Sequence, residues 1–349
     1  MKKAYLVLAD GKVFEGEAFG AVGTVGGELT FNTGVVGYLE MMTDSVNYGR
    51  IILQTFPMLG DYGVMEEDLL GKPYVKGFAV REWCAAPSNF RCQYDIDKYM
   101  KDNGIVGICG IDTREITKII REEGSMNAVI SESLPVDPAL LNADYTAGAV
   151  KAVAPEGGKT VKADKAEYKV TLVDFGAKDN LAAEFAARGC DVTTAAFDAS
   201  AEEILASNPD AVILSDGPGK PEELTDVIEQ IKKLNKPVFA VGLGHCLLAL
   251  ANDGKVEKLK YGHMGGDQPV KHIGFVRSYI TSQNHMYAVN AASVAGAEET
   301  FTNINDGTNE GLAYKNNSVS YAFVPVTCAG PQDEGFIFDD FIKTLGGAD

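Results

Sequence analysis

The stretch that decides the fold reads Val238-Phe239-Ala240-Val241-Gly242-Leu243-Gly244-His245-Cys246. An apolar run meets a Gly-Leu-Gly turn, and an apolar helical pattern follows at residues 247–251. This order predicts a buried strand that turns sharply into a helix. Such a turn commonly presents a nucleophile, because the N-terminus of the helix stabilises a thiolate. The tip is Gly242, which has no side chain and can perform no covalent chemistry.

Strands and helices are expected to alternate around this turn. The apolar runs predict strands at 169–174, 191–194, 211–215 and 237–241, and helices at 180–188, 202–207, 221–234 and 244–251. This alternation indicates a doubly wound parallel sheet, so residues 168–349 are predicted to form an α/β domain. Hairpins and a final helix near 339–345 are expected to complete it. Ligands bind such sheets at the carboxyl ends of the strands, where Gly242 lies.

The N-terminal part of the chain has a different pattern. Asp10-Gly11 between two short apolar runs indicates a hairpin. Further strands are expected at 28–31, 51–56 and 75–80, and helices at 95–102 and 113–122, the second capped by Asp112. Residues 1–144 are therefore predicted to be an α+β domain. Residues 145–167 are rich in Ala, Gly and Lys without a sustained period, which predicts a linker.

Composition and charge limit the partners. The 349 residues suffice for two domains, and 31 basic against 49 acidic side chains give a net charge of −18. Such a charge argues against nucleic acid or an anionic membrane as partner. The N-terminus has no signal-peptide pattern and no apolar run is long enough to span a membrane, so a cytoplasmic location is expected. Six scattered cysteines and four histidines indicate free thiols and no metal site.

Several segments resemble a known family. In the second half they are Asp-Phe-Gly-Ala-Lys-Asp-Asn at 174–180, Ser-Asp-Gly-Pro-Gly at 215–219, Gly-Leu-Gly-His at 242–245 and Ser-Gln-Asn-His at 282–285. In the first half they are residues 31–34, 37–38, 43–44, 88–91 and 110–114. Together these segments resemble the small subunit of carbamoyl-phosphate synthetase. This subunit joins its own N-terminal domain to a class I glutamine amidotransferase domain, and the resemblance covers nearly the whole chain.

The resemblance implies a reaction and a partner. Members of the family hydrolyse glutamine with a Cys-His-Glu triad, and backbone N–H groups, including those of the Gly-Pro-Gly loop, hold the oxyanion. The ammonia passes through a tunnel to the large subunit, which uses ATP and bicarbonate to make carbamoyl phosphate. The resemblance therefore implies a hetero-oligomer with the large subunit, in pyrimidine or arginine nitrogen metabolism. It implies no cofactor in this chain, with ATP and Mg²⁺ in the large subunit.

The matching positions lack the catalytic residues. Gly242 stands at the nucleophile position, Val324 at the base and Val326 at its orienting carboxylate. The glutamine-pocket positions that survive are Gly217, Gly219, Leu243, Asn284 and Tyr287, and the altered ones are Val46, Cys246 and Met286. The changes affect all three triad positions together, which predicts that glutamine hydrolysis is lost and that the chain is a structural or regulatory pseudo-glutaminase.

Two other hypotheses remain open. In the first, Cys246 or Cys328 acts as a relocated nucleophile on another amide or ester. His245 and Cys246 point about 100° apart around a helix, so they are not expected to form a dyad, and His285 is the remaining candidate base. In the second, the chain is a stand-alone regulator that binds a small molecule, because Val46, Met286, Val324 and Val326 make the pocket more apolar.

Overall fold

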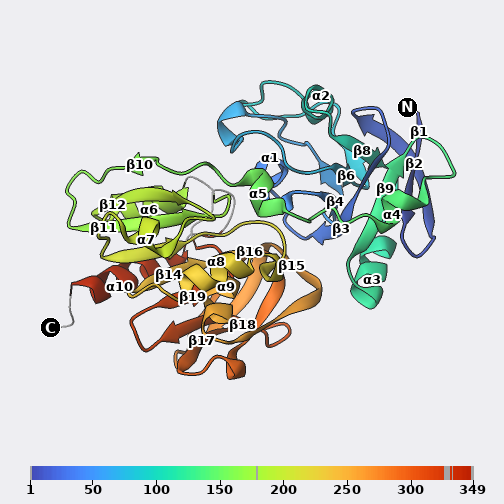
Figure 1. The fold of residues 1–349 in the computed structure, drawn as a ribbon. Coiled ribbons are helices and arrows are strands. Elements are labelled where there is room, and N and C mark those ends of the chain that lie inside the picture. The colour runs from blue at the N-terminus through green and yellow to red at the C-terminus, as the bar shows by residue number, and fades with distance from the viewer. Residues whose placement is uncertain (1, 178–179, 326–330, 332, 347–349) are drawn as a thin grey trace. The chain divides into compact units, whose positions relative to one another are not determined.

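The computed structural model describes residues 2–177, 180–325, 331 and 333–346 (Figure 1). The chain forms two compact units. The first consists of Met1–Ala147 with Lys260–Gly265, and the second of Gly148–Leu259 with Gly266–Asp349. The boundary after Ala147 lies close to the end of the predicted first domain at residue 144. The return of Lys260–Gly265 to the first unit was not predicted, because these residues belong to a long strand, β15 (Lys255–His272), without a break in composition.

The segment 145–167 differs from the expected linker. It contains helix α5 (Ala149–Val153) and strand β10 (Thr160–Val161), and most of it belongs to the second unit. β10 pairs with β12 (Cys190–Ala196), so its backbone is ordered by a neighbouring strand. Elements this short cannot show the periodic spacing of apolar residues by which helices and strands are recognised. They were therefore not predicted from the sequence.

The first unit is built around a closed barrel with strand order β1-β2-β8-β6-β4-β3-β9. The strands are β1 (Lys3–Leu8), β2 (Val13–Gly20), β3 (Val25–Asn32), β4 (Arg50–Gln54), β6 (Gly77–Ala79), β8 (Val106–Cys109) and β9 (Met126–Ser131). A separate pair is formed by β5 (Met58–Leu59) and β7 (Glu82–Trp83). β1 and β2 are antiparallel, which confirms the hairpin predicted at Asp10-Gly11.

Helices accompany this barrel, as the α+β prediction requires. They are α1 (Tyr38–Thr43), α2 (Ile96–Asp102), α3 (Thr113–Glu123) and α4 (Pro138–Asn142), with 3-10 turns η1 (Ser45–Asn47) and η2 (Glu66–Asp68). The predicted cap of α3 is confirmed, because Asp112 Oδ1 accepts hydrogen bonds from the backbone N–H groups of Arg114 (3.1 Å) and Glu115 (3.0 Å). Ile116 and Ile120 of α3 are buried in one core with residues of the barrel strands.

The second unit contains a ten-stranded sheet with order β10-β12-β11-β13-β14-β19-β18-β17-β15-β16. The remaining strands are β11 (Tyr168–Asp174), β13 (Ala211–Leu214), β14 (Val238–Val241), β16 (Ser278–Asn290), β17 (Ala297–Asn303), β18 (Asn309–Tyr314) and β19 (Val319–Tyr321). β12, β11, β13, β14 and β19 run parallel, which confirms the predicted doubly wound α/β sheet. β17 and β18 continue it with antiparallel pairing.

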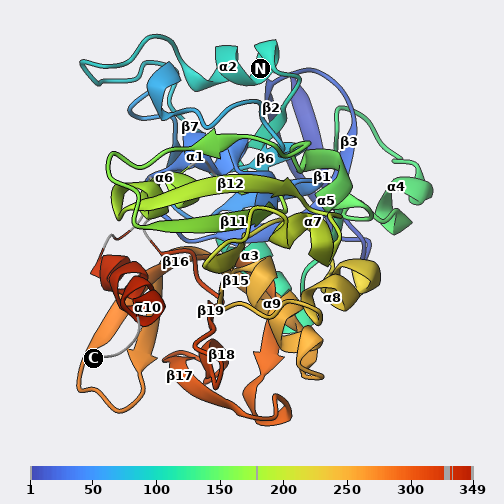
Figure 2. The same cartoon turned by 60° about the vertical axis from the view of Figure 1, so that its left-hand side comes forward.

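Helices cover both faces of this sheet (Figure 2). α6 (Asn180–Ala187) and α10 (Phe336–Leu345) pack on one face, and α7 (Ala201–Leu205), α8 (Thr225–Ile231) and α9 (Leu243–Ala251) on the other. β14 contributes side chains to the cores on both faces of the sheet. Phe239 and Val241 face the first group of helices, and Val238 and Ala240 face the second group. The predicted helix 221–234 is divided into a 3-10 turn, η3 (Pro221–Glu223), and α8.

Two further 3-10 turns are η4 (Ala291–Ser293) and η5 (Asp333–Gly335). Among the described residues, none of the helices combines the length and the apolar character that crossing a membrane requires.

Candidate functional site

The turn from β14 into α9 has the predicted geometry. β14 ends at Val241, Gly242 follows with φ 54° and ψ −116°, and α9 begins at Leu243. A positive φ of this kind favours glycine, because any other L-residue is strained there. The Gly242 N–H donates to the carbonyl of Tyr321 (2.9 Å) and the Gly244 N–H to that of Ser215 (3.0 Å). The turn is therefore fixed between β19 and the loop that follows β13.

Gly242 packs directly against the side chain of Asp216. A Cβ atom at residue 242 would overlap Oδ1 and Cγ of Asp216 and would lie 2.8 Å from Asp216 Cβ. Real Cβ atoms do not approach other heavy atoms this closely. The carboxyl group of Asp216 thus takes the space in which the side chain of a nucleophile would begin.

The Asp216 carboxylate also binds two backbone N–H groups. Its Oδ1 accepts hydrogen bonds from Gly217 (2.8 Å) and from Leu243 (2.9 Å). In hydrolases with a strand–turn–helix elbow, the N–H after the nucleophile and an N–H from a neighbouring loop hold the oxyanion of the reaction. Leu243 follows the elbow tip and Gly217 lies in the neighbouring loop, so a carboxylate of the chain itself engages the pair of donors in these two positions.

The loop that carries Asp216 is held in place by Ser215. The Ser215 hydroxyl is fully buried, accepts from the N–H of Phe175 (2.8 Å) and donates to the carbonyl of Asp216 (2.7 Å). A Cβ at residue 217 would lie 2.5 Å from the carbonyl oxygen of Phe175, so this position requires glycine. The sequence pointed to Gly217, Gly219 and Leu243 but missed Asp216. The signal that could have identified Asp216 is an acidic residue placed between a buried strand and the Gly-Pro-Gly turn.

The other predicted pocket positions are distributed as follows. Asn284, Met286 and Tyr287 lie on β16, and Met286 is buried. Val324 donates its N–H to the carbonyl of Ser282 (3.2 Å), so the position predicted for the base adjoins the same strand. Tyr287 packs against the core cluster that contains Cys246. Val46 is buried in η1 of the first unit, whereas Val326 and Cys328 lie outside the described residues.

Neither Cys246 nor His245 has the properties of a catalytic group. Burial, together with the charges of Asp216, Glu222 and Glu310, raises the pKa of the Cys246 thiol to about 12, so the thiol stays protonated. His245 is fully buried, and burial lowers the pKa of its imidazole to about 3. Its Nδ1 lies 2.7 Å from Ser320 Oγ, and Asn309 also interacts with the ring. Five of the six cysteines are described, and all five are free thiols.

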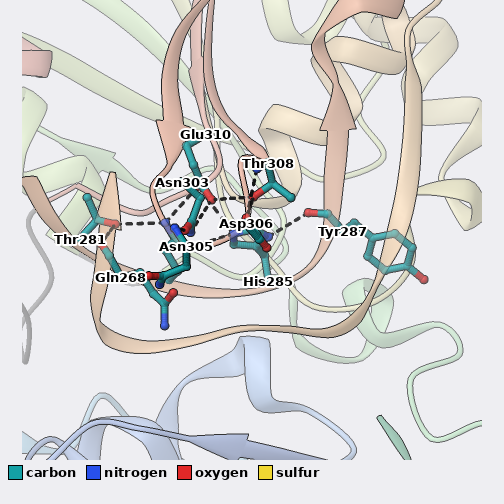
Figure 3. A network of polar contacts seen from close by, with 10 residues as sticks. Gln268, Thr281, His285, Tyr287, Asn303, Asn305, Asp306, Thr308 and Glu310 are labelled. Atoms are coloured by element: carbon teal, nitrogen blue, oxygen red, sulfur yellow. Dashed lines mark hydrogen bonds and ion pairs between the residues drawn. The ribbon is translucent and has the colours of Figure 1, made fainter. Parts of the chain in front are cut away.

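A network of buried polar side chains lies across β16, β17 and β18 (Figure 3). At its centre is Glu310, whose side chain is fully buried. The carboxylate accepts hydrogen bonds from Gln283 Nε2 (3.0 Å) and Asn303 Nδ2 (3.2 Å), and it lies 3.8 Å from His285 Nε2. A buried carboxylate is stable only with such partners. This network was not predicted from the sequence, because its members lie on three different strands.

Hydrogen bonds extend this network along β16 and to Gln268 of β15. Thr281 donates its hydroxyl proton to the carbonyl of Gln268 (2.9 Å), so its oxygen accepts from Gln283 Nε2 (3.1 Å). With Nε2 facing Thr281 and Glu310, Oε1 of Gln283 faces His285 Nε2 (3.1 Å).

The second nitrogen of His285 also faces an acceptor. Its Nδ1 lies 2.8 Å from the carbonyl of Tyr287. Both imidazole nitrogens of His285 are therefore engaged within the network, and the carboxylate of Glu310 lies beside Nε2. The role of His285 as the remaining base stays a prediction. The contact of His285 with the Tyr287 carbonyl fixes the backbone at a predicted pocket position.

Glu334 in η5 is a second buried carboxyl group. Its side chain is 2% exposed, and its Oε1 has no hydrogen-bond partner among the described residues. Burial raises the pKa of the group from its usual 4.5 to about 7. The folded chain therefore favours the protonated form. This contribution to stability is complete below the unfolded pKa and is lost as the pH rises through 7.

We expect the variant Glu334→Gln to remove this pH dependence. Relative to the variant, the wild type should lose about 1 to 3 kcal/mol of unfolding free energy between about pH 5 and pH 8. Denaturant unfolding of both proteins at the two pH values measures the difference. Equal losses in wild type and variant would show that Glu334 ionises normally in the folded chain.

A cavity of about 540 Å³ lies elsewhere in the second unit. Thr171, Thr194 and Ser207 contribute hydroxyl groups to its lining, together with Asp198 and Glu203. It contains none of the predicted site residues, so it is separate from the elbow at Gly242.

Both halves of the chain match known families. Residues 6–130 match the CPSase domain of the carbamoyl-phosphate synthase small chain, and residues 171–344 match the class-I glutamine amidotransferase family. Among solved structures, a glutamine amidotransferase from Thermotoga maritima is 18% identical, covers 52% of this chain and 86% of that chain, and gives a TM-score of 0.37.

Curated relatives align over nearly their whole length. The carbamoyl phosphate synthase small chain of Clostridium perfringens is 43% identical and covers 98% of this chain and 99% of its own. The small chain of Syntrophotalea carbinolica is 42% identical, with 98% of both chains covered. The pyrimidine-specific small chain of Bacillus subtilis is 38% identical and covers 98% of this chain and 96% of its own. The chain therefore belongs to the family of carbamoyl phosphate synthase small chains.

Proposed function

We propose that this chain is the small chain of a carbamoyl phosphate synthase complex and that it has lost glutamine hydrolysis. It binds the large chain as a structural or regulatory subunit, and the ammonia for the reaction comes from solution. ATP and Mg²⁺ serve the large chain, and this chain holds no cofactor. The product supplies pyrimidine or arginine synthesis. The full-length match to curated small chains supports the assignment to such a complex.

The observation that carries the proposed loss of activity is the contact between Gly242 and Asp216. The elbow has no nucleophilic side chain, and the space for one is filled by the Asp216 carboxylate. That carboxylate also engages the N–H groups of Gly217 and Leu243, which a reaction intermediate would need. Val324 adds an apolar side chain at the position of the base. The assignment of Val326 rests on the sequence alone.

The properties of Cys246 argue against a relocated nucleophile. Its thiol is buried and protonated, and His245 beside it is neutral and paired with Ser320. Cys328 lies outside the described residues, so this hypothesis survives only for that thiol. A complex in the cytoplasm agrees with the free state of the described cysteines.

The assay that tests the proposal compares two nitrogen sources. The chain is purified together with its large chain, and carbamoyl phosphate formation is measured with ammonium and with glutamine. We expect a rate with ammonium and no glutamine-dependent rate above the background without nitrogen source, because the elbow supplies no nucleophile.

The ammonium reaction is the internal control, since it shows that the large chain is active in the same preparation. Glutamine-dependent formation of carbamoyl phosphate at a rate similar to that with ammonium would overturn the proposal. Failure of the two chains to purify together would overturn the proposed role as a subunit and would favour the stand-alone regulator.

A further inference from the structure

We propose that Asp216 is a built-in carboxylate ligand, which closes the elbow of this chain to any external carbonyl or carboxylate oxygen. The inference rests on the proposed loss of glutamine hydrolysis, because a working glutaminase needs the same two N–H groups for its substrate. It adds the residue that occupies the site and the class of ligand that the site excludes.

The two donors converge on one oxygen from separate segments. The N–H of Gly217 comes from the loop after β13 and the N–H of Leu243 from the first turn of α9, and both reach Asp216 Oδ1 at 2.8 and 2.9 Å. These lengths are typical of hydrogen bonds to an ionised acceptor. A carboxylate at the start of α9 also interacts favourably with the positive end of the helix dipole.

The site needs an occupant in every state of the protein. Gly217 and Leu243 are buried, so N–H groups left without an acceptor there would cost stability. Enzymes with an open oxyanion site leave such groups to water or substrate. Here the side chain that precedes Gly217 supplies the acceptor, and no external group is required.

The Asp216 carboxyl group and a nucleophilic side chain at residue 242 would occupy the same space. A Cβ at residue 242 would overlap the Asp216 carboxyl group, so a nucleophile at the elbow and Asp216 in this position exclude one another. Any side chain at 242 would have to displace Asp216 and would thereby expose the two N–H groups. Gly242 and Asp216 therefore act as one unit.

Removal of the Asp216 carboxylate should leave the N–H groups of Gly217 and Leu243 able to bind a small anion. We choose formate as the probe, since it carries a carboxylate and little else. In thermal unfolding of the full chain, formate should stabilise Asp216→Gly in a saturable manner, with binding at least about tenfold tighter than to wild type. Sodium chloride at equal ionic strength serves as the reference in each titration.

A matched control is offered by Asp112 at the N-terminus of α3. Its Oδ1 accepts from two backbone N–H groups in the same way, but Arg114 and Glu115 are exposed and water can replace the carboxylate. Formate should therefore stabilise Asp112→Gly no more than wild type. Equal formate binding by wild type and Asp216→Gly, or none by a folded Asp216→Gly, would overturn the proposal.

A second variant covers the case in which Asp216→Gly does not fold. Asp216→Asn keeps the shape of the side chain, but its neutral oxygen is a weaker acceptor. The amide proton resonances of Gly217 and Leu243 should then move upfield, while those of Arg114 and Glu115 stay in place. Unchanged resonances at Gly217 and Leu243 would overturn the proposal. Both measurements use the chain without its large chain, so their outcome is independent of the nitrogen-source assay.

Discussion

Replacing Gly242 with alanine is expected to lower the free energy of unfolding by about 2 to 6 kcal/mol. Two effects add. The φ of 54° strains any residue with a Cβ, and the new methyl group overlaps the Asp216 carboxyl group. The surrounding backbone cannot yield easily, because the N–H groups of Gly242 and Gly244 are tied to Tyr321 and Ser215. Denaturant unfolding followed by circular dichroism measures the loss.

The two effects can be separated with a matched glycine. Gly274 has a φ of 82°, and no heavy atom of the described residues lies within 4 Å of its Cβ position, so Gly274→Ala measures the backbone strain alone. The excess loss in Gly242→Ala then belongs to the overlap with Asp216. In the Asp216→Gly background this excess should disappear, which a double-mutant cycle measures as coupling of about 1 to 3 kcal/mol. If Gly242→Ala costs no more than Gly274→Ala, the overlap has no energetic consequence.

The parts of the fold that could be predicted are those with a local cause. The β14–α9 turn follows from an apolar run, a glycine at the tip and an apolar helical pattern, all within residues 237–251. The cap of α3 by Asp112 likewise depends on three neighbouring residues. The 18 residues of β15 could not be predicted, because its neighbours are set by contacts with distant strands.

The candidate site likewise has parts that could be predicted from the sequence and parts that could not. The absence of a side chain at the tip of the β14–α9 turn could be predicted, since Gly242 can be recognised from the sequence around it. The position of Asp216 could not, because its carboxylate reaches Leu243 across 27 residues of sequence. The contacts of His285 with Gln283 and with the carbonyl of Tyr287 likewise become visible only in the three-dimensional structure.

Replacing Glu310 with alanine is expected to lower the free energy of unfolding by about 2 to 5 kcal/mol, because it leaves two buried amide donors without their acceptor. His285 Nε2 would also lose the carboxylate oxygen that lies 3.8 Å from it. The side-chain amides of Gln283 and Asn303 would lose the oxygens to which they donate. The destabilisation should be greatest in the strands around the network. Backbone amide hydrogen exchange should therefore become faster first in β16 and β18.

A control residue on β17 distinguishes this network from an ordinary surface carboxylate. Glu299 also accepts a hydrogen bond from a side-chain amide, that of Asn309 (2.9 Å), but it is exposed, so Glu299→Ala should cost less than about 1 kcal/mol. Glu310→Gln should fall between the two, because its amide oxygen can still accept one of the two hydrogen bonds. A cost for Glu310→Ala as small as that for Glu299→Ala would mean that the network does not hold β16 in place. The backbone of Tyr287 would then be positioned by other contacts.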